Sequence, residues 1–335
     1  MLDVKRIQET LRYARLWEMD LTVFGSMAHQ YYLAPPLPVG ALERWETEHG
    51  LTLPEDYRTY ITQVGNGLAG PGYGILPFDL QTFDPAWKNP CIYGPERQEE
   101  YNAVATEVQE LMDEEVCTPE QDARYEADYE KLVGRLMRDG VLTIGTSGCC
   151  GVYGVALNGG NCGAFLHLTD ELEYYDPGPN SRYVRPFAQV VEDWRAKIEA
   201  ACDALTQAQL NRSARERRWM AEFAARWSEG AFEEAQRLVH ELEKAPSISN
   251  KCLGFLDYLG KQSKDRANPS HWRKSGENWK ELGRRMDAIV AARRGSFLPA
   301  LSYPGYTRWY LCKHLTLEQF LDSLEEKTEV PAENS

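Results

Sequence analysis

Residues 41–78 constrain the fold most, because they hold an ordered series of helix and turn signals around no reactive group. The segment reads ALERWETEHGLTLPEDYRTYITQVGNGLAGPGYGILPF. A first helical pattern stops at Gly50, and Pro54 opens a second one that ends before the Asn66-Gly67 pair. After a glycine-proline turn, residues 73–78 have the composition of a short strand. The sequence therefore predicts helix, step, helix, turn and strand.

A set of short motifs around and beyond this segment carries a family resemblance. The motifs are the Gly50 break, Leu53-Pro54-Glu55-Asp56-Tyr57, Asn66-Gly67, Gly70-Pro71-x-Tyr73-Gly74-x-Leu76, Leu142-Thr143-Ile144-Gly145, Gly148-Cys149-Cys150-Gly151, Tyr153, Val155 to Asn158 and Gly163. Together they resemble the SUKH superfamily, the Smi/Knr-like proteins. The resemblance implies a mixed α+β fold with a largely antiparallel sheet flanked by helices, and it covers roughly the first 200 residues.

Two parts of the chain depart from that pattern and set the expected domain organisation. We expect a SUKH-like domain over residues 1–201, with a helical insertion at about 88–138 that breaks at Thr118-Pro119. We expect an all-α domain over residues 202–335 that ends in a disordered tail. Further predicted strands cover residues 141–144, 152–157, 164–168 and 172–175, and further predicted helices lie within 1–34 and over 187–201, 249–259, 270–294 and 316–325, with two more on either side of Gly230.

Charge is distributed unevenly along the 335 residues. Residues 1–201 carry a net charge of -16 and residues 202–335 carry +2, and residues 96–130 alone hold 13 acidic side chains against Arg97 and Arg124. No stretch approaches the roughly 20 apolar residues of a membrane span, and the N-terminus lacks the apolar core of a signal peptide. We therefore expect a cytoplasmic protein that does not associate with membranes.

The acidic segment has two interpretations. It is either the solvated face of a surface helical hairpin or an electronegative surface that recognises a basic partner. The central candidates for recognition are carboxylates, and aromatic residues that flank the segment are candidate anchors for slow release. These partner-binding candidates are Trp87, Tyr93, Tyr101, Glu107, Glu110, Asp113, Glu114 and Glu115.

The sequence predicts no catalytic, cofactor or metal site. The glycines between Gly145 and Gly154 lack the ending of a phosphate loop and fit tight strand turns. The six histidines are isolated from one another, and the adjacent Cys149 and Cys150 are more simply two small side chains at a strand start than a vicinal disulfide or metal contact. His167 paired with either cysteine remains the alternative that would allow nucleophilic chemistry.

Basic and aromatic residues are mixed near the C-terminus, where Trp272 and Trp279 accompany seven lysines and arginines. The apolar members fall on one side of a predicted helix, which leaves the charges to the solvated side. This pattern, with the near-neutral charge of the region, argues against direct nucleic-acid binding.

The resemblance implies a non-enzymatic immunity protein, because many SUKH proteins neutralise toxins by binding them. Its partner would be a cognate bacterial toxin with a basic surface, blocked by steric and electrostatic occlusion. The alternative is a regulatory or scaffold adaptor, since fungal members of the superfamily resemble signalling scaffolds. An enzyme that uses Cys149 or His167 is a third reading.

Overall fold

The computed structural model describes residues 1–113, 118–148, 151–169, 184–262 and 276–293. The chain divides into two compact units. The first unit comprises Met1–Gln8 and Tyr32–Ala196, and the second comprises Glu9–Tyr31 and Lys197–Ser335. The predicted boundary at residues 201 and 202 stays a prediction, because it concerns independent folding, which compactness alone does not test.

The first unit contains the helix, step and helix that the sequence predicts. Helix α3 (Val39–His49) ends at Gly50, whose φ of 57° is the left-handed conformation that glycine adopts most readily. Helix α4 (Glu55–Thr59) continues as a π-helical turn, η1 (Tyr60–Val64), in which the Gly65 amide donates to the Tyr60 carbonyl. The Glu46 carboxylate accepts a hydrogen bond from the Leu53 amide at 2.9 Å, which fixes the step between the helices.

The Asn66-Gly67 pair aligns the chain that follows η1. The Asn66 side chain donates to the Phe78 carbonyl at 3.0 Å and accepts from the Phe78 amide at 2.8 Å, as a neighbouring strand would. Gly67 has a φ of 104°, and a Cβ there would lie 2.8 Å from the Pro77 nitrogen. The motif therefore requires both residue types.

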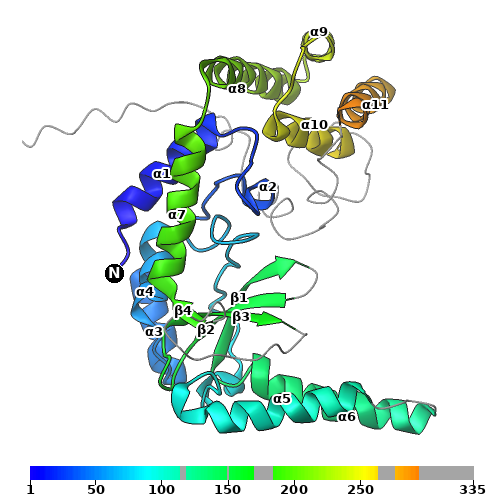
Figure 1. Ribbon diagram of the computed structural model, residues 1–335. Coiled ribbons are helices and arrows are strands. Elements are labelled where there is room, and N and C mark those ends of the chain that lie inside the picture. Colours follow the sequence, from blue (N-terminus) through cyan, green and yellow to red (C-terminus); the bar gives the residue numbers. More distant parts are fainter. Residues whose placement is uncertain (114–117, 149–150, 170–183, 263–275, 294–335) are drawn as a thin grey trace, which may run out of the picture. The chain divides into compact units, whose positions relative to one another are not determined.

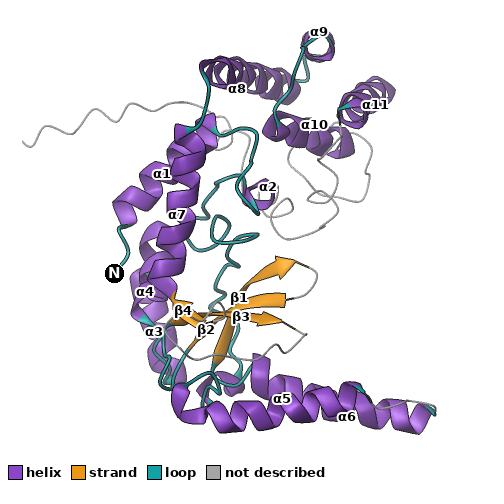
Figure 2. Ribbon diagram, viewed as in Figure 1, coloured by secondary structure: helices purple, strands orange, loops and turns teal. Residues whose placement is uncertain are grey.

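The sheet has four antiparallel strands in the order β1-β2-β3-β4 (Figure 2). They are β1 (Val141–Gly148), β2 (Gly151–Ala156), β3 (Ala164–Thr169) and β4 (Val184–Pro186). Together with the surrounding helices they confirm the predicted α+β class and three of the predicted strands. The fourth predicted strand, at 172–175, lies outside the described residues.

The strand predicted at residues 73–78 is wrong in extent. Only Ile75 forms bridges, to Leu68 on one side and to Gly145 of β1 on the other. Gly72 and Gly74 have φ values of 62° and 106°, which interrupt an extended run. The segment crosses the sheet edge at one residue instead of pairing along it.

The insertion forms the predicted helical hairpin, which continues from two short 3₁₀ turns, η2 (Pro85–Lys88) and η3 (Pro95–Arg97). Helices α5 (Gln98–Met112) and α6 (Pro119–Met137) pack against each other (Figure 1). Thr118 caps α6: its hydroxyl accepts from the Gln121 amide, and the Gln121 side chain accepts from the Thr118 amide. Thr118 and Pro119 thus start α6, as the sequence predicts.

Two helices have residues in both units, α1 (Val4–Trp17) and α7 (Phe187–Asp203). The second unit adds α2 (Ser26–His29), α8 (Gln207–Glu229), α9 (Phe232–Glu243), α10 (Asn250–Gln262) and α11 (Glu277–Ala292). Gly230 ends α8 with a φ of 77°, as its position in the sequence predicts. Helix α11 begins at Glu277. The predicted start at residue 270 and the predicted helix at 316–325 lie outside the described residues.

The second unit has its own apolar core, which joins its N-terminal segment to the C-terminal helices. Met19 is 1% exposed and packs in one cluster with Phe223, Trp227, Leu256 and Met286. Across the described helices, no segment is long and apolar enough to cross a membrane.

Candidate functional site

The base of the α5–α6 hairpin is tied to the first unit by polar contacts from both of its ends. The Arg138 guanidinium pairs with Asp84 at 2.9 Å, and the Asn89 amide donates to Asp139 at 2.8 Å. At the start of the hairpin, the Glu96 carboxylate accepts from the Gly160 amide at 2.7 Å. These contacts hold the hairpin in a defined position on the first unit.

The inner side of the hairpin is apolar and packs against the sheet. Tyr101, Val104 and Val108 join one buried cluster with Leu166 of β3 and Val184 of β4. The inner side of the hairpin therefore covers part of the sheet, and the outer side of the hairpin faces solvent.

Two of the three predicted aromatic anchors, Tyr93 and Tyr101, belong to this buried cluster, and the third, Trp87, packs against other aromatic rings. Tyr93 is 6% exposed and Tyr101 is 4% exposed, with their rings 5.5 Å apart. Trp87 is half-buried, and its ring lies 6.0 Å from Phe83 and 6.2 Å from Trp45. In this conformation the two tyrosines are core residues, so a partner meets Trp87 before it can meet either of them. A role in partner binding stays a prediction for all three.

The predicted carboxylates of α5 lie on its outer side. Glu107, Glu110 and Asp113 are exposed, and none of them forms an ion pair with another described residue. At about 100° per residue they fall within the same arc as Glu99, opposite the buried Val104 and Val108. Glu114 and Glu115 lie outside the described residues.

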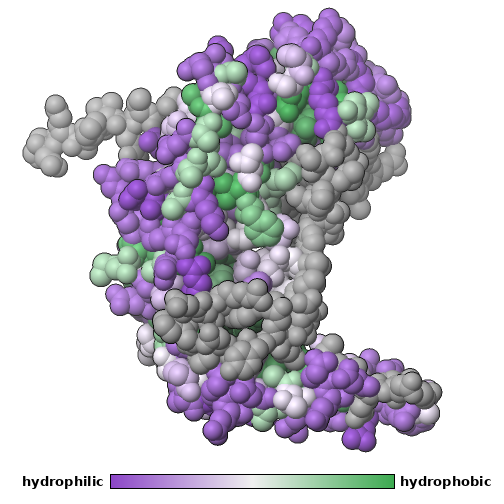
Figure 3. Space-filling model, viewed as in Figure 1, coloured by the Kyte–Doolittle hydropathy of each residue, from purple (hydrophilic) through white to green (hydrophobic). Residues whose placement is uncertain are grey.

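Helix α6 contributes further exposed carboxylates that form no ion pair with a described residue and that are not among the predicted partner-binding residues. We call the exposed carboxylates without an ion pair, within the described part of the hairpin, the acidic face. Its members are Glu99, Glu107, Glu110, Asp113, Glu120, Asp122, Glu126 and Glu130. In Figure 3 the described surface of the hairpin is mostly hydrophilic.

Two other acidic residues of the same segment, Glu96 and Glu100, form hydrogen bonds or ion pairs within the fold. Glu100 pairs with Arg97 at 2.6 Å and with Arg135 at 2.7 Å, and the hydrogen bond from Arg97 holds the Glu100 pKa below its usual range. Hydrogen bonds from the backbone amides of Glu96 itself and of Gly160 lower the pKa of Glu96. The sequence alone does not separate carboxylates that have partners in the fold from those of the acidic face. The one local signal is Arg97, three residues before Glu100.

The carboxylates of the acidic face destabilise the end of helix α5. Glu110 lies in the last turn of α5 and Asp113 is its C-cap, where the partial negative charge of the helix end repels carboxylates. Neighbouring like charges three residues apart add to that repulsion. Such an arrangement can attract a cationic surface from solution, and it offers no group for bond-making chemistry.

The described residues do not assemble a catalytic or metal centre. The ring of His167 lies 5.2 Å from that of Tyr153 across the β2–β3 pair, in a packing contact. Cys149 and Cys150, its proposed partners, lie outside the described residues. No group of three or more potential metal ligands occurs among the described side chains.

The basic residues of α11 are matched by acidic neighbours. Lys280 pairs with Glu277 at 3.1 Å, and Arg285 forms hydrogen bonds of 2.8 and 3.0 Å with Glu243. The second of these ion pairs joins α11 to α9. The described basic and aromatic mixture near Trp279 is thus accounted for within the fold.

Comparison with known proteins adds one match. The SMI1 / KNR4 family (SUKH-1) matches residues 36–195, which include α3, α4, the hairpin and the whole sheet. No curated protein and no solved structure gives a significant match. The segments that precede and follow the match supply α1, α2 and α8–α11. The chain therefore contains a SMI1/KNR4 (SUKH-1) family domain over residues 36–195.

Proposed function

We propose that this chain is a non-enzymatic immunity protein that binds a cognate bacterial toxin in the cytoplasm and neutralises it by steric and electrostatic occlusion. The family of its domain includes immunity proteins. The observation that carries the proposal is the acidic face. Its eight carboxylates are exposed and form no ion pair with a described residue, and polar contacts hold the base of their hairpin on the first unit.

A surface of this kind suits an inhibitor that must outcompete substrate. Clustered charge speeds the encounter with a basic partner, and a rigid mount avoids the entropic cost of ordering a flexible segment on binding. The toxin would present a basic surface, such as the groove of an enzyme that acts on nucleic acid. Covering that groove blocks it without any chemistry by the inhibitor.

Co-expression with the toxin encoded by the neighbouring gene tests the proposal. Protection of the cells, together with recovery of a complex, is the expected outcome. Failure of both would contradict the proposal. Recovery of several housekeeping proteins without a toxin would instead favour the adaptor reading.

Charge reversal tests the acidic face by itself. Glu107→Lys, Glu110→Lys and Asp113→Lys together should weaken toxin binding and reduce its dependence on salt, because rim charges act over the screening length of about 10 Å at 0.1 M salt. The matched control reverses Asp203, Glu233 and Glu234, three exposed carboxylates of the second unit that form no ion pair with a described residue. Equal affinity and equal salt dependence in both variants would remove the acidic face from the mechanism.

A further inference from the structure

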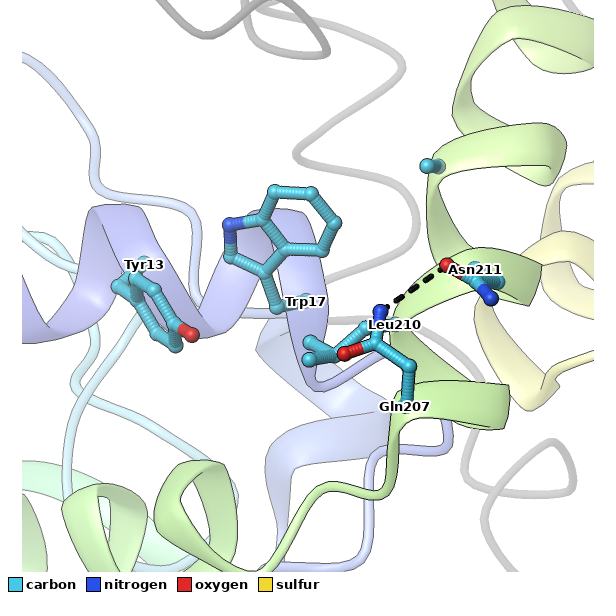
Figure 4. A pocket seen from close by; sticks show the side chains of 6 residues that line it. Tyr13, Trp17, Gln207, Leu210 and Asn211 are labelled. Atoms are coloured by element: carbon cyan, nitrogen blue, oxygen red, sulfur yellow. Dashed lines mark hydrogen bonds between the residues drawn. The ribbon is translucent and has the colours of Figure 1, made fainter.

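An open hollow of about 280 Å³ lies within the second unit, between α1 and α8. Tyr13 and Trp17 line it from α1, and Leu210 and Ala214 line it from α8 (Figure 4). Tyr13 is 46% exposed, so a large aromatic ring is left facing solvent at one wall. The volume lies just below the range of about 300–1,000 Å³ that small-molecule pockets occupy, so the hollow suits one side chain of a protein partner.

The rim of the hollow is cationic. The Arg217 guanidinium lies 4.3 Å from the centre of the Trp17 ring. Arg218 and Arg215 follow Ala214 and Asn211 by one helical turn, and both are exposed and form no ion pair with a described residue. The polar residues that line the hollow are the amides Gln207 and Asn211, which share a hydrogen bond of 3.1 Å, and the six lining residues include no carboxylate. A partner segment should therefore combine an aromatic or apolar side chain with carboxylates.

Helix α6 of this chain carries such a segment. Asp122, Glu126 and Glu130 recur every four residues, and Tyr125 and Tyr129 alternate with them along the helix. Tyr129 also packs against the apolar cluster of the inner side, and Tyr125 does not belong to that cluster. The two tyrosine rings stack 6.0 Å apart with an angle of 7° between their planes, and both side chains are half-exposed. The stripe thus has the charge opposite to that of the hollow and a similar aromatic content.

We propose that the hollow binds the α6 stripe of a second copy of this chain, so that the protein associates with itself in solution. Tyr125 of one copy enters the hollow of the other, and its Glu126 and Glu130 meet Arg215 and Arg218. Because the hollow and the stripe are different surfaces, the contact either occurs twice in a two-fold symmetric pair or continues head to tail. The proposal does not rest on toxin binding, and it uses carboxylates of α6 where the toxin test uses those of α5.

A charge swap in the full-length protein tests this pairing. One variant carries Arg215→Glu and Arg218→Glu, and the other carries Glu126→Arg and Glu130→Arg. Sedimentation velocity over a concentration series should show self-association of the wild type at low salt and its loss at high salt. Each variant alone should dissociate about tenfold more readily or more, because every contact then faces like charge. An equimolar mixture of the two variants should regain the association, because both of its contacts are again attractive.

Two controls separate this pairing from other occupants of the hollow. Lys244→Glu, an exposed charge reversal elsewhere in the second unit, should leave the association unchanged, and Tyr13→Ala should weaken it without changing charge. A monomeric wild type at every concentration and salt level would overturn the proposal. So would a mixture that stays monomeric, or an association that nuclease treatment abolishes, since the latter would assign the hollow to nucleic acid.

Discussion

At the scale of single residues, the end of α5 places charge where the helix dipole opposes it. Replacing Glu110 by Gln and Asp113 by Asn keeps the side-chain shapes and removes that repulsion. We expect each change to stabilise the last turn of α5 by about 0.3–1 kcal/mol. Amide hydrogen exchange of the α5 backbone measures the effect. Glu99→Gln is the matched control, since Glu99 lies in the first turn and its loss should lower protection. Faster exchange in the Glu110 and Asp113 variants would contradict the interpretation.

Lys251 provides a second residue-scale prediction, from its burial. Its side chain is 2% exposed and donates to the Arg15 carbonyl at 2.6 Å, and burial, followed by the nearby Arg15 and Arg217 charges, lowers its pKa well below the ordinary value. Between the folded and unfolded pKa values, the unfolded chain binds one proton more. This lysine therefore makes the free energy of unfolding rise with pH, until the pH reaches the ordinary lysine pKa of about 10.4.

The Lys251→Met variant isolates that contribution. Buried tyrosines and cysteines with raised pKa values, such as Tyr101 and Cys252, act in the opposite direction at alkaline pH, so the informative quantity is the difference between variant and wild type. Urea denaturation followed by circular dichroism should show the wild type gaining stability relative to the variant as pH rises from about 7 to about 10. A difference that does not change with pH over this range would show that Lys251 has the same pKa in the folded and the unfolded chain, which would contradict the interpretation.

At the scale of elements, the hairpin has two sides with different tasks. Tyr101→Ala removes a ring from the cluster that joins α5 to the sheet, and we expect a loss of about 3 kcal/mol in the stability of the first unit. Glu107→Ala, two turns further along the outer side, should change stability by less than about 0.5 kcal/mol. Chemical denaturation of both variants tests the assignment of Tyr101 to the core. If both substitutions change stability by equally small amounts, Tyr101 is not a core residue and is again a candidate for an exposed anchor.

The sequence predicts these elements better than it predicts what their side chains contact. Thr118 and Pro119 specify the start of α6 locally, and Gly50 and Gly230 stop helices by their left-handed backbone conformation, so each signal is readable without tertiary information. The exposure of Tyr101 depends on which face of α5 meets the sheet, and that contact joins residues far apart in sequence. For the same reason the pairing of Glu100 with Arg135, 35 residues away, could not be predicted from the local pattern.

At the scale of the whole molecule, the second unit is built from segments at both ends of the chain. Backbone carbonyls that follow or end α1 accept hydrogen bonds from α8 and α10: Trp17 from Ser213 at 3.1 Å, and Asp20 from the Asn250 amide at 2.7 Å. The Asp20 carboxylate also pairs with Arg212. The N-terminal segment therefore belongs to the structure of the C-terminal helices, which no motif in the sequence indicates, because the partners are about 190 to 230 residues apart.

Because the N-terminal segment packs with the C-terminal helices, a substitution in that segment should affect limited proteolysis of those helices. Met19→Asp places a carboxylate in the core of the second unit, at a site that is 1% exposed. We expect cleavage within α8–α11 to accelerate, while residues 32–196 stay resistant. Phe24→Asp is the matched control, since Phe24 lies in the same segment and is 63% exposed. Equal resistance of wild type and Met19→Asp would mean that the segment is dispensable for the second unit.

The most direct test of the proposed function is the affinity for the toxin encoded by the neighbouring gene, measured over a salt series for wild type and for the Glu107→Lys, Glu110→Lys, Asp113→Lys variant. The acidic face predicts tight binding by the wild type that weakens steeply with salt. It also predicts, for the variant, an affinity at least about tenfold lower with a shallower salt dependence. Wild-type affinity and wild-type salt dependence in that variant would contradict the account.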